Sequence, residues 1–159
     1  SEARLLAAEH NLIKAAKKEI VVAVYAFSSK YLGQALSAAL KRGVKIRILL
    51  DADNARKSYS IDEWLAGEGI EVRLIEIKRG SLHHKFILID AKIITTGSYN
   101  FTNESEFRNY EAAIFTNHKG LIQAFAAEFD RLWSECIPAD SPVQPPIDAE
   151  ATGPLQCAD

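Results

Sequence analysis

The sequence has no apolar run that approaches the roughly 20 residues needed to span a bilayer, which excludes a transmembrane helix. It has only two cysteines, Cys136 and Cys157, and neither stands in a CxxC spacing. A disulfide framework and a cysteine zinc site are therefore excluded, although the two thiols could still pair with each other. Net charge is also small, because 19 basic and 21 acidic residues give −2. Taken alone, that balance argues against a protein built to hold nucleic acid.

Proline is missing from most of the chain, since all five prolines fall after Cys136. The same stretch contains four acidic residues and neither Lys nor Arg. A Pro-rich acidic segment buries too little apolar surface to offset the entropy lost on ordering. We therefore predict one folded domain at residues 1–136 and a flexible, Pro-rich acidic tail at residues 137–159.

The composition that remains is globular, with 48% hydrophobic and 25% charged residues in a chain of 159. Helical spacing of apolar residues predicts helices at 5–18, 31–42, 61–67 and 118–135, the third opened by a capping box from Ser60 to Glu63. Short apolar runs predict strands at 20–27, 44–50, 72–77, 84–89, 93–96 and 110–115. This alternation predicts an α/β fold, a mixed β-sheet flanked by helices.

Polar side chains capable of holding a phosphate cluster around the predicted hairpin at 84–96. In an extended chain alternate side chains share a face, so His83 and Lys85 point together while His84 points away. Ser98 and Asn100 share a face by the same rule. An ammonium, a hydroxyl and an amide that converge beside an imidazole form a cradle for a phosphate group.

Two acidic residues accompany this cluster. Glu111 interrupts the apolar run YEAAIF, and an inward carboxylate needs a partner, for which His83 is the candidate. A carboxylate on one ring nitrogen fixes the tautomer and leaves the other nitrogen free to attack. Asp90 lies on the face opposite His83, so we expect it to hold the hairpin turn or a neighbouring backbone. Each residue alone has a common structural role, and only their joint spacing favours chemistry.

Two short motifs, HxKx4D and GSxN, bring these residues into one pattern. They are His83-x-Lys85-x4-Asp90 and Gly97-Ser98-x-Asn100. The pattern resembles the HKD motif of the phospholipase D superfamily, and Glu111 resembles the glutamate that orients the catalytic histidine in that family. From about residue 10 to 135 the chain is similar to the single-motif branch, the bacterial Nuc-type endonucleases and, more distantly, the mitochondrial cardiolipin hydrolases. The resemblance implies that Asp90 and Gly97 are structural residues of the motif.

The resemblance also implies a mechanism, metal-independent hydrolysis of a phosphodiester through a phosphohistidine at His83, with no cofactor. Such a mechanism needs two histidines at one phosphate, and the chain carries one HKD motif. His10 and His118 lie in predicted helical segments and His84 points away. We therefore predict a homodimer whose composite active site contains His83 from both copies.

A metal-dependent reaction is the rival for this chemistry. Asp51 and Asp53, at the end of a predicted strand, could bind a divalent cation. The structural alternative is a pair of loop carboxylates that cap backbone N–H groups, and it is favoured because no third acid stands at a useful spacing. We therefore predict no metal site.

The substrate is indicated by local charge. Residues 30–95 hold twelve basic and eight acidic residues, and without the tail's acids the body carries 19 basic against 17 acidic residues. Loops after strands border the ligand crevice of open α/β sheets, which suggests nucleic-acid contacts at Arg56, Lys57, Tyr59, Lys78 and Arg79. A solvated helix end is the alternative for Lys41 and Arg42, and packing is the alternative to base stacking for Tyr59 and Tyr99.

Three functions compete at this point. The first is an endonuclease that cleaves DNA, single-stranded DNA or RNA with little sequence preference, and the resemblance favours it. The second is a phospholipid or cardiolipin phosphodiesterase of the same superfamily, for which the sequence shows no apolar docking segment. The third is a non-catalytic nucleic-acid-binding module, which the intact motif disfavours. Nuc-type relatives are often exported, so we expect a periplasmic or secreted protein, with the cytoplasm as the alternative.

Overall fold

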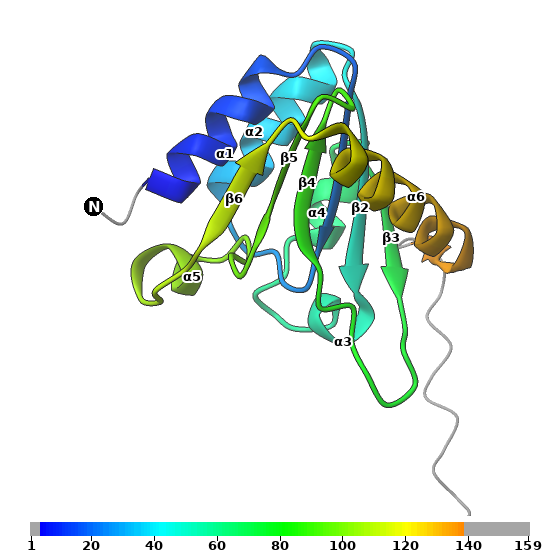
Figure 1. Ribbon diagram of the computed structural model, residues 1–159. Coiled ribbons are helices and arrows are strands. Elements are labelled where there is room, and N and C mark those ends of the chain that lie inside the picture. Colours follow the sequence, from blue (N-terminus) through cyan, green and yellow to red (C-terminus); the bar gives the residue numbers. More distant parts are fainter. Residues whose placement is uncertain (1–3, 139–159) are drawn as a thin grey trace, which may run out of the picture.

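A seven-stranded mixed sheet organises residues 4–138, the part of the chain that the computed structural model describes, and helices cover both of its faces (Figure 1). The helices are α1 (Arg4–Ala15), α2 (Lys30–Lys41), α3 (Ala52–Ala55), α4 (Asp62–Gly67), α5 (Asn103–Phe107) and α6 (Lys119–Glu135). The strands are β1 (Glu19–Val24), β2 (Lys45–Asp51), β3 (Glu71–Ile75), β4 (Lys85–Ile89), β5 (Ile93–Gly97), β6 (Ala113–Thr116) and β7 (Ile137–Pro138).

The sheet has the order β6-β5-β4-β1-β2-β3-β7, with β1 at its centre. β1, β2 and β3 run parallel, whereas β4, β5 and β6 follow one another in antiparallel pairs. The centre of β1 is buried on both faces, as its continuous apolar run predicts. The predicted α/β fold with a mixed sheet is therefore confirmed.

Two apolar clusters, one on each face of the sheet, form the core. Alternate residues of β1 and β4, such as Val22 and Ile87, pack with α1, α2 and α4. The residues between them, such as Ala23 and Phe86, pack against Phe129 and its neighbours on α6. The alternation in β1 and β4 thereby assigns neighbouring residues to opposite faces, which fixes where the side chains at the ends of these strands point.

Several predicted boundaries are wrong because contacts between distant parts of the chain set them. The strand predicted at 20–27 ends at Val24, after which the chain leaves the sheet toward an isolated bridge between Phe27 and Phe101. Ser60 opens no capping box: the N-cap of α4 is Ile61, which has no side-chain cap and whose N–H donates to the carbonyl of Phe27 at 3.2 Å. That bond holds residue 61 against the end of β1, so the helix starts later.

Two short helices were not predicted, and both begin where a polar side chain caps the turn. The carboxylate of Asp51 accepts from the N–H of Asn54 at the start of α3. The hydroxyl of Thr102 accepts from the N–H of Ser105 at the start of α5. Both follow strand ends at the same edge of the sheet, so they surround the polar residues discussed below.

The predicted tail is only partly described. Its first two residues, Ile137–Pro138, form β7 and pair with β3, so the ordered domain extends beyond residue 136. The remaining residues, 139–159 with Cys157, lie outside the described residues, and the flexible tail stays a prediction. Within the described range, Cys136 is a free thiol that donates to the carbonyl of Leu132. No helix of residues 4–138 is long and apolar enough to cross a membrane.

Candidate functional site at one end of the sheet

Apart from Asp90, the residues of the two motifs meet at the edge where β1, β2 and β3 end, the lower edge of the sheet in Figure 1. His83 stands just before β4, whose first residue is Lys85. Ser98 directly follows β5. Because β4 and β5 are antiparallel neighbours, the start of one strand lies beside the end of the other. The topology therefore brings together residues that are about fifteen positions apart in the sequence.

An aromatic ring that the sequence analysis did not single out lies between His83 and Lys85. The ring of Tyr25 is 4.8 Å from the His83 ring, centroid to centroid, and Lys85 Nζ is 5.2 Å from the Tyr25 centroid. Lys85 Nζ also donates to the carbonyl of His83 at 2.9 Å. The Tyr25 ring thus contacts both the exposed imidazole of His83 and the ammonium of Lys85 and keeps them next to each other. The only signal for it is an aromatic residue at the end of the central apolar run.

The ammonium of Lys85 sits in a site that partly disfavours its charge. Partial burial lowers the pKa of Lys85, and the nearby carboxylate of Glu111 opposes that shift. A cation that is partly removed from water interacts more strongly with an incoming anion than a solvated lysine does. Lys85 is therefore placed to bind a phosphate oxygen.

Glu111 contacts the second motif rather than His83. Its carboxylate accepts from Ser98 Oγ and, at 3.2 Å, from Asn109 Nδ2. Residues 4–138 contain no hydrogen bond between Glu111 and His83, contrary to the predicted pairing. The reason is that β6 begins only at Ala113, so Glu111 lies in the segment before the strand and not inside it. There it orients the Ser98 hydroxyl.

Gly97 permits the close approach of these two segments. A Cβ at this position would stand 2.0 Å from the carbonyl oxygen of Ala112. The same carbonyl accepts from the N–H of Ser98 at 2.9 Å, and the N–H of Ala112 donates to Ser98 Oγ at 3.1 Å. Any larger residue at 97 would force the strands apart and move Ser98.

Tyr99 and Asn100 point in opposite directions, as alternation predicts. Tyr99 is 3% exposed, and its hydroxyl donates to the buried carboxylate of Glu106 at 2.6 Å. Packing, and not base stacking, is therefore its role. Asn100 lines a surface pocket instead, and its Oδ1 is buried without a hydrogen-bond partner in residues 4–138. Tyr99 therefore fixes this segment in the core, and Asn100 places the end of the GSxN motif at the pocket.

Asp51 acts as a backbone anchor. Its carboxylate accepts from the N–H of Leu82 at 2.9 Å and from the N–H of Asn54 at 3.0 Å, which fixes the segment that leads into His83. Asp53 instead forms an exposed ion pair with Arg56 at 2.9 Å. In the described part of the chain, no three His, Cys, Asp or Glu side chains group as metal ligands. The capping interpretation of Asp51 accounts for its contacts.

Asp90 directly follows the far end of β4, about 16 Å from Lys85 at 3.3 Å per residue. Its carboxylate accepts from three backbone N–H groups, those of Lys17 at 2.9 Å, Lys18 at 2.7 Å and Glu19 at 3.0 Å. Burial raises the pKa of Asp90, but these three hydrogen bonds outweigh it, and the net pKa lies below the usual value. The third residue of the HxKx4D motif thus fastens α1 to β1 and touches no part of the site.

A second buried carboxylate, Glu9, lies behind the site and was also missed. It is 2% exposed, and within residues 4–138 only one of its oxygens has a partner, the Thr95 hydroxyl at 2.6 Å. Burial raises the pKa of Glu9 to about 7, although the Thr95 hydrogen bond works against the shift. The sequence signal for a buried Glu9 is its position in a predicted helix among apolar residues.

The three other histidines are engaged away from His83. His84 faces α6, where its ring lies 3.8 Å from the Glu128 carboxylate. His10 stacks on Tyr31 at 4.5 Å. His118 caps α6, accepting from the N–H of Leu121. In this chain His83 is therefore the one histidine at the site.

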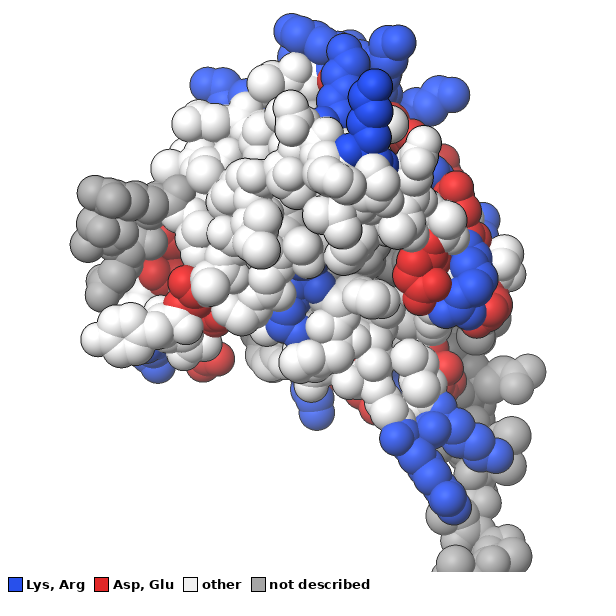
Figure 2. Space-filling view, viewed as in Figure 1, with Lys and Arg blue, Asp and Glu red and all other residues white. Residues whose placement is uncertain are grey.

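The predicted nucleic-acid contacts separate into distinct groups. Lys78 and Arg79 are exposed on the β3–β4 loop, which projects beyond the site edge and carries blue side chains at the lower right of Figure 2. Lys57 is also exposed, whereas Arg56 pairs with Asp53 and, at 3.5 Å, with Glu76. Tyr59 lines the same pocket as Asn100.

Lys41 and Arg42 lie at the opposite end of the sheet. Arg42 donates to the carbonyls of Ile13 and Lys14 at the end of α1, and Lys41 pairs with Glu68 at 3.3 Å. The helix-end interpretation holds for these two residues.

Known proteins are similar to this chain over nearly the same residues as the resemblance described in the sequence analysis. A family model described as "Cardiolipin synthase, PLD-like domain" matches residues 10–133. The mitochondrial cardiolipin hydrolase of Canis lupus familiaris is 34% identical over 124 residues, which cover 78% of this chain and 48% of that protein. The chain thus spans about half the length of the cardiolipin hydrolases that it matches.

Two solved structures share the fold. Nuc, a phospholipase D family member from Salmonella typhimurium, is 31% identical with a TM-score of 0.77, and the match covers 86% of this chain and 90% of that chain. NucT from Helicobacter pylori has a TM-score of 0.80 at 22% identity, with 86% of this chain and 92% of that chain covered. The mixed sheet with helices on both faces is therefore the fold of these proteins.

Proposed function

The chain belongs to the family of PLD-like domains, and from that premise we propose that it is a metal-independent phosphodiesterase that cleaves nucleic acid as an endonuclease. The observation that carries the proposal is the convergence of an exposed imidazole, an ammonium and a hydroxyl, from His83, Lys85 and Ser98, at one sheet edge. The resemblance to Nuc-type endonucleases stated above favours nucleic acid over lipid.

In the proposed reaction a ring nitrogen of His83 attacks phosphorus, a phosphorus–nitrogen bond forms, and the bond to the leaving oxygen breaks. An acid must give that oxygen a proton. Water then attacks phosphorus, gives its proton to the same group acting as a base, and the phosphorus–nitrogen bond breaks. Lys85 and Asn100 donate to the non-bridging oxygens as their charge grows, and Ser98 does so once its hydroxyl turns from Glu111 to the phosphate. Glu111, through Ser98, is a positioning residue.

The acid in the first step is best supplied by His83 of a second copy of the chain. The positions of His10, His84 and His118 support this, because each is held by other contacts away from the site. We therefore propose a homodimer with one composite site on a two-fold axis. Gel filtration with activity measured across the peak tests it, since an active monomer would contradict the composite site.

A lipid phosphodiesterase is the second candidate, and the names of the cardiolipin hydrolases favour it. Against it stands the chemistry of the pocket beside Asn100, which is lined mostly by polar side chains. The exposed Lys57, Lys78 and Arg79 near the same edge suit a phosphate backbone.

The proposal is tested by incubating the chain in EDTA with single-stranded DNA, RNA and cardiolipin vesicles. We expect cleavage of nucleic acid, a loss of at least about 10³-fold in His83→Ala, and retention of activity in His84→Ala. The two variants remove neighbouring histidines that face opposite sides of the sheet, which makes the second a matched control.

Three outcomes would overturn parts of this account. Undiminished activity in His83→Ala would remove the mechanism. Cleavage of cardiolipin alone would replace the substrate, and binding of DNA without cleavage of any diester would leave a non-catalytic module.

A further inference from the structure

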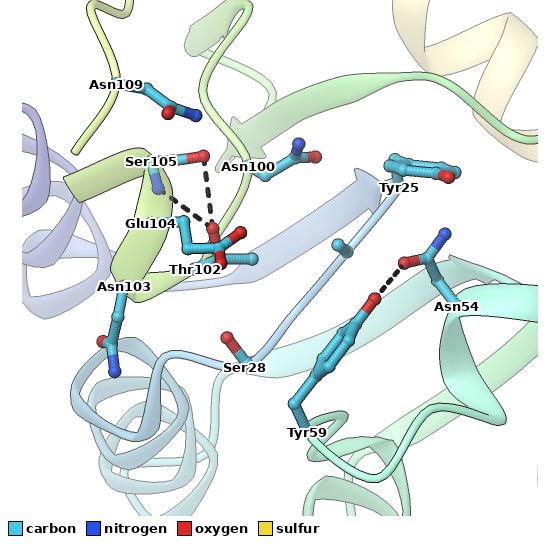
Figure 3. A pocket seen from close by; sticks show the side chains of 11 residues that line it. Tyr25, Ser28, Asn54, Tyr59, Asn100, Thr102, Asn103, Glu104, Ser105 and Asn109 are labelled. Carbon is cyan, nitrogen blue, oxygen red and sulfur yellow. Dashed lines mark hydrogen bonds between the residues drawn. The ribbon is translucent and has the colours of Figure 1, made fainter. Parts of the chain in front are cut away.

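A pocket of about 380 Å³ opens beside Asn100 (Figure 3). Its walls come from the segment after β1, which includes Tyr25 and Ser28, from Asn54 and Tyr59, and from α5 with the residues around it. Tyr25 lines the pocket and also contacts His83 and Lys85, so the pocket borders the site proposed to hold the reacting phosphate. A group bound there would be covalently attached to that phosphate or lie next to it.

The lining of this pocket is unsuited to an acyl chain. Of its eleven residues none is Leu, Ile, Val, Phe, Met or Trp, and Ala26 is the one aliphatic side chain. Four asparagines supply amide donors and acceptors, while Ser28, Thr102 and Ser105 supply hydroxyls. Acyl chains bind where apolar side chains predominate. This pocket therefore fits a compact polar group with several hydrogen-bonding edges.

Asn100 needs a ligand that donates a hydrogen bond. Its Oδ1 is buried and has no partner in the described residues. A phosphodiester oxygen can only accept, so the phosphate itself cannot satisfy this atom. An N–H or O–H of the group attached to the phosphate can, and it would recover the free energy lost by burying an unpaired acceptor.

Glu104 and Tyr59 define the rest of the ligand. Burial raises the pKa of Tyr59, and the nearby Tyr25 and Glu104 raise it further, so Tyr59 stays protonated and donates to Asn54 Oδ1 at 2.8 Å. The Tyr59 side chain is 52% exposed, which leaves ring surface available for stacking. A carboxylate such as Glu104 repels a further phosphate but accepts from amino, imino or hydroxyl groups. The ligand is thus uncharged, planar in part and rich in donors.

We propose that this pocket binds the nucleoside adjoining the scissile phosphate, so that the substrate is nucleic acid with that base unstacked. The inference rests on the proposed phosphodiesterase activity and adds to it a binding site for one nucleoside of the substrate. Amide side chains pair with the edges of bases, and an aromatic face stacks on them. Because a paired base cannot enter a side pocket, single strands are preferred over duplexes.

The test compares esters that share a leaving group. Thymidine 5′- and 3′-(p-nitrophenyl phosphate) differ from methyl p-nitrophenyl phosphate in carrying a nucleoside. For wild type we expect kcat/KM to favour at least one thymidine ester over the methyl ester. In Tyr59→Ala that preference should fall on the order of 10-fold, the effect of losing one stacked base, and it should also fall in Glu104→Gln.

Tyr31→Ala is the matched control, because Tyr31 is exposed to a similar extent, 50%, but stacks on His10 outside the pocket. It should leave the preference unchanged. The nucleoside site would be overturned if wild type had the same kcat/KM for the methyl ester as for both thymidine esters, or if both pocket variants kept the wild-type preference. Neither result would contradict the proposed phosphodiesterase activity. Hydrolysis of none of the three esters would instead remove the proposed function.

Discussion

The two ends of the sheet use polar side chains in opposite ways. At the site end the His83 ring is exposed, and Asn100 Oδ1 is buried without a partner in the described residues. At the other end Asp90 gives its carboxylate to three backbone N–H groups, and Arg42 donates to two carbonyls. Groups left with open hydrogen-bonding capacity mark where a ligand is expected, and saturated groups mark where the fold is fastened. One motif, HxKx4D, contains both kinds.

Charge alone does not separate the two ends. Lys and Arg also gather over the end opposite the site, at the top of Figure 2, where Lys17, Lys18, Lys45 and Lys92 are exposed beside strand starts and the hairpin turn. A net charge near zero therefore averages over basic regions at both ends. What distinguishes the site is a lysine that is partly buried beside an imidazole and a hydroxyl.

The largest difference between the two ends should appear when one lysine is removed from each end in separate variants. Lys85→Met removes the ammonium but keeps the apolar stem, and we expect kcat for a diester to fall about 10²–10³-fold, as for loss of one group that stabilises transition-state charge. Lys92→Met, at the opposite end, should leave kcat unchanged. Steady-state rates of the two variants give the comparison. Equal losses would mean that charge anywhere on the domain supports the reaction.

The buried carboxylate behind the site should make the fold less stable as the pH rises. Glu9 has a folded-state pKa of about 7 against an ordinary value of 4.5. Because the folded protein favours the protonated carboxyl of Glu9, this group stabilises the fold fully below pH 4.5, and the stabilisation is lost as the pH rises through 7. The free energy of unfolding should fall by about 3 kcal/mol over this range. Urea unfolding at pH 5 and pH 8 measures it.

Glu9→Gln should lack this loss between pH 5 and pH 8, whereas the exposed Glu63→Gln should behave like wild type. A pH dependence that is the same in wild type and in Glu9→Gln would show that Glu9 is not the group responsible.

The opposite sign is expected at the other end, with a smaller effect. Asp90→Ala leaves three N–H groups without their acceptor and should lower the free energy of unfolding by about 2 kcal/mol at neutral pH, since water replaces part of the contact. Because the pKa of Asp90 is lowered, its contribution is present above its ordinary value of 3.8 and is lost as the pH falls below it. Urea unfolding at pH 7 and pH 3, with kcat measured on the folded fraction, checks both the size and the independence from catalysis.

The sheet and the residues of the two motifs could be predicted from the sequence, because both depend on local patterns. The apolar run before Tyr25 has the composition of a strand covered on both faces, and alternation alone separates His83 from His84. The boundaries that depend on contacts between residues far apart in the sequence could not be predicted. Ile61 starts α4 because its N–H is held by Phe27, 34 positions earlier in the chain.

The partners within the site were also beyond local reasoning. The predicted pairing of Glu111 with His83 requires Glu111 to lie in a strand, but β6 begins only at Ala113, and the Glu111 carboxylate accepts from Ser98 instead. The bond between Asp51 and Leu82 joins residues that are 31 positions apart. Such contacts depend on which strands become neighbours, and sequence spacing does not specify that.

The covalent intermediate at His83 is tested most directly by the stereochemistry at phosphorus. A phosphorothioate diester of one configuration is hydrolysed in water enriched in oxygen-18, and the configuration of the thiophosphate product is determined. Two successive in-line displacements, first by His83 and then by water, predict net retention of configuration. Net inversion would mean that water attacks the diester directly and would contradict the phosphohistidine mechanism.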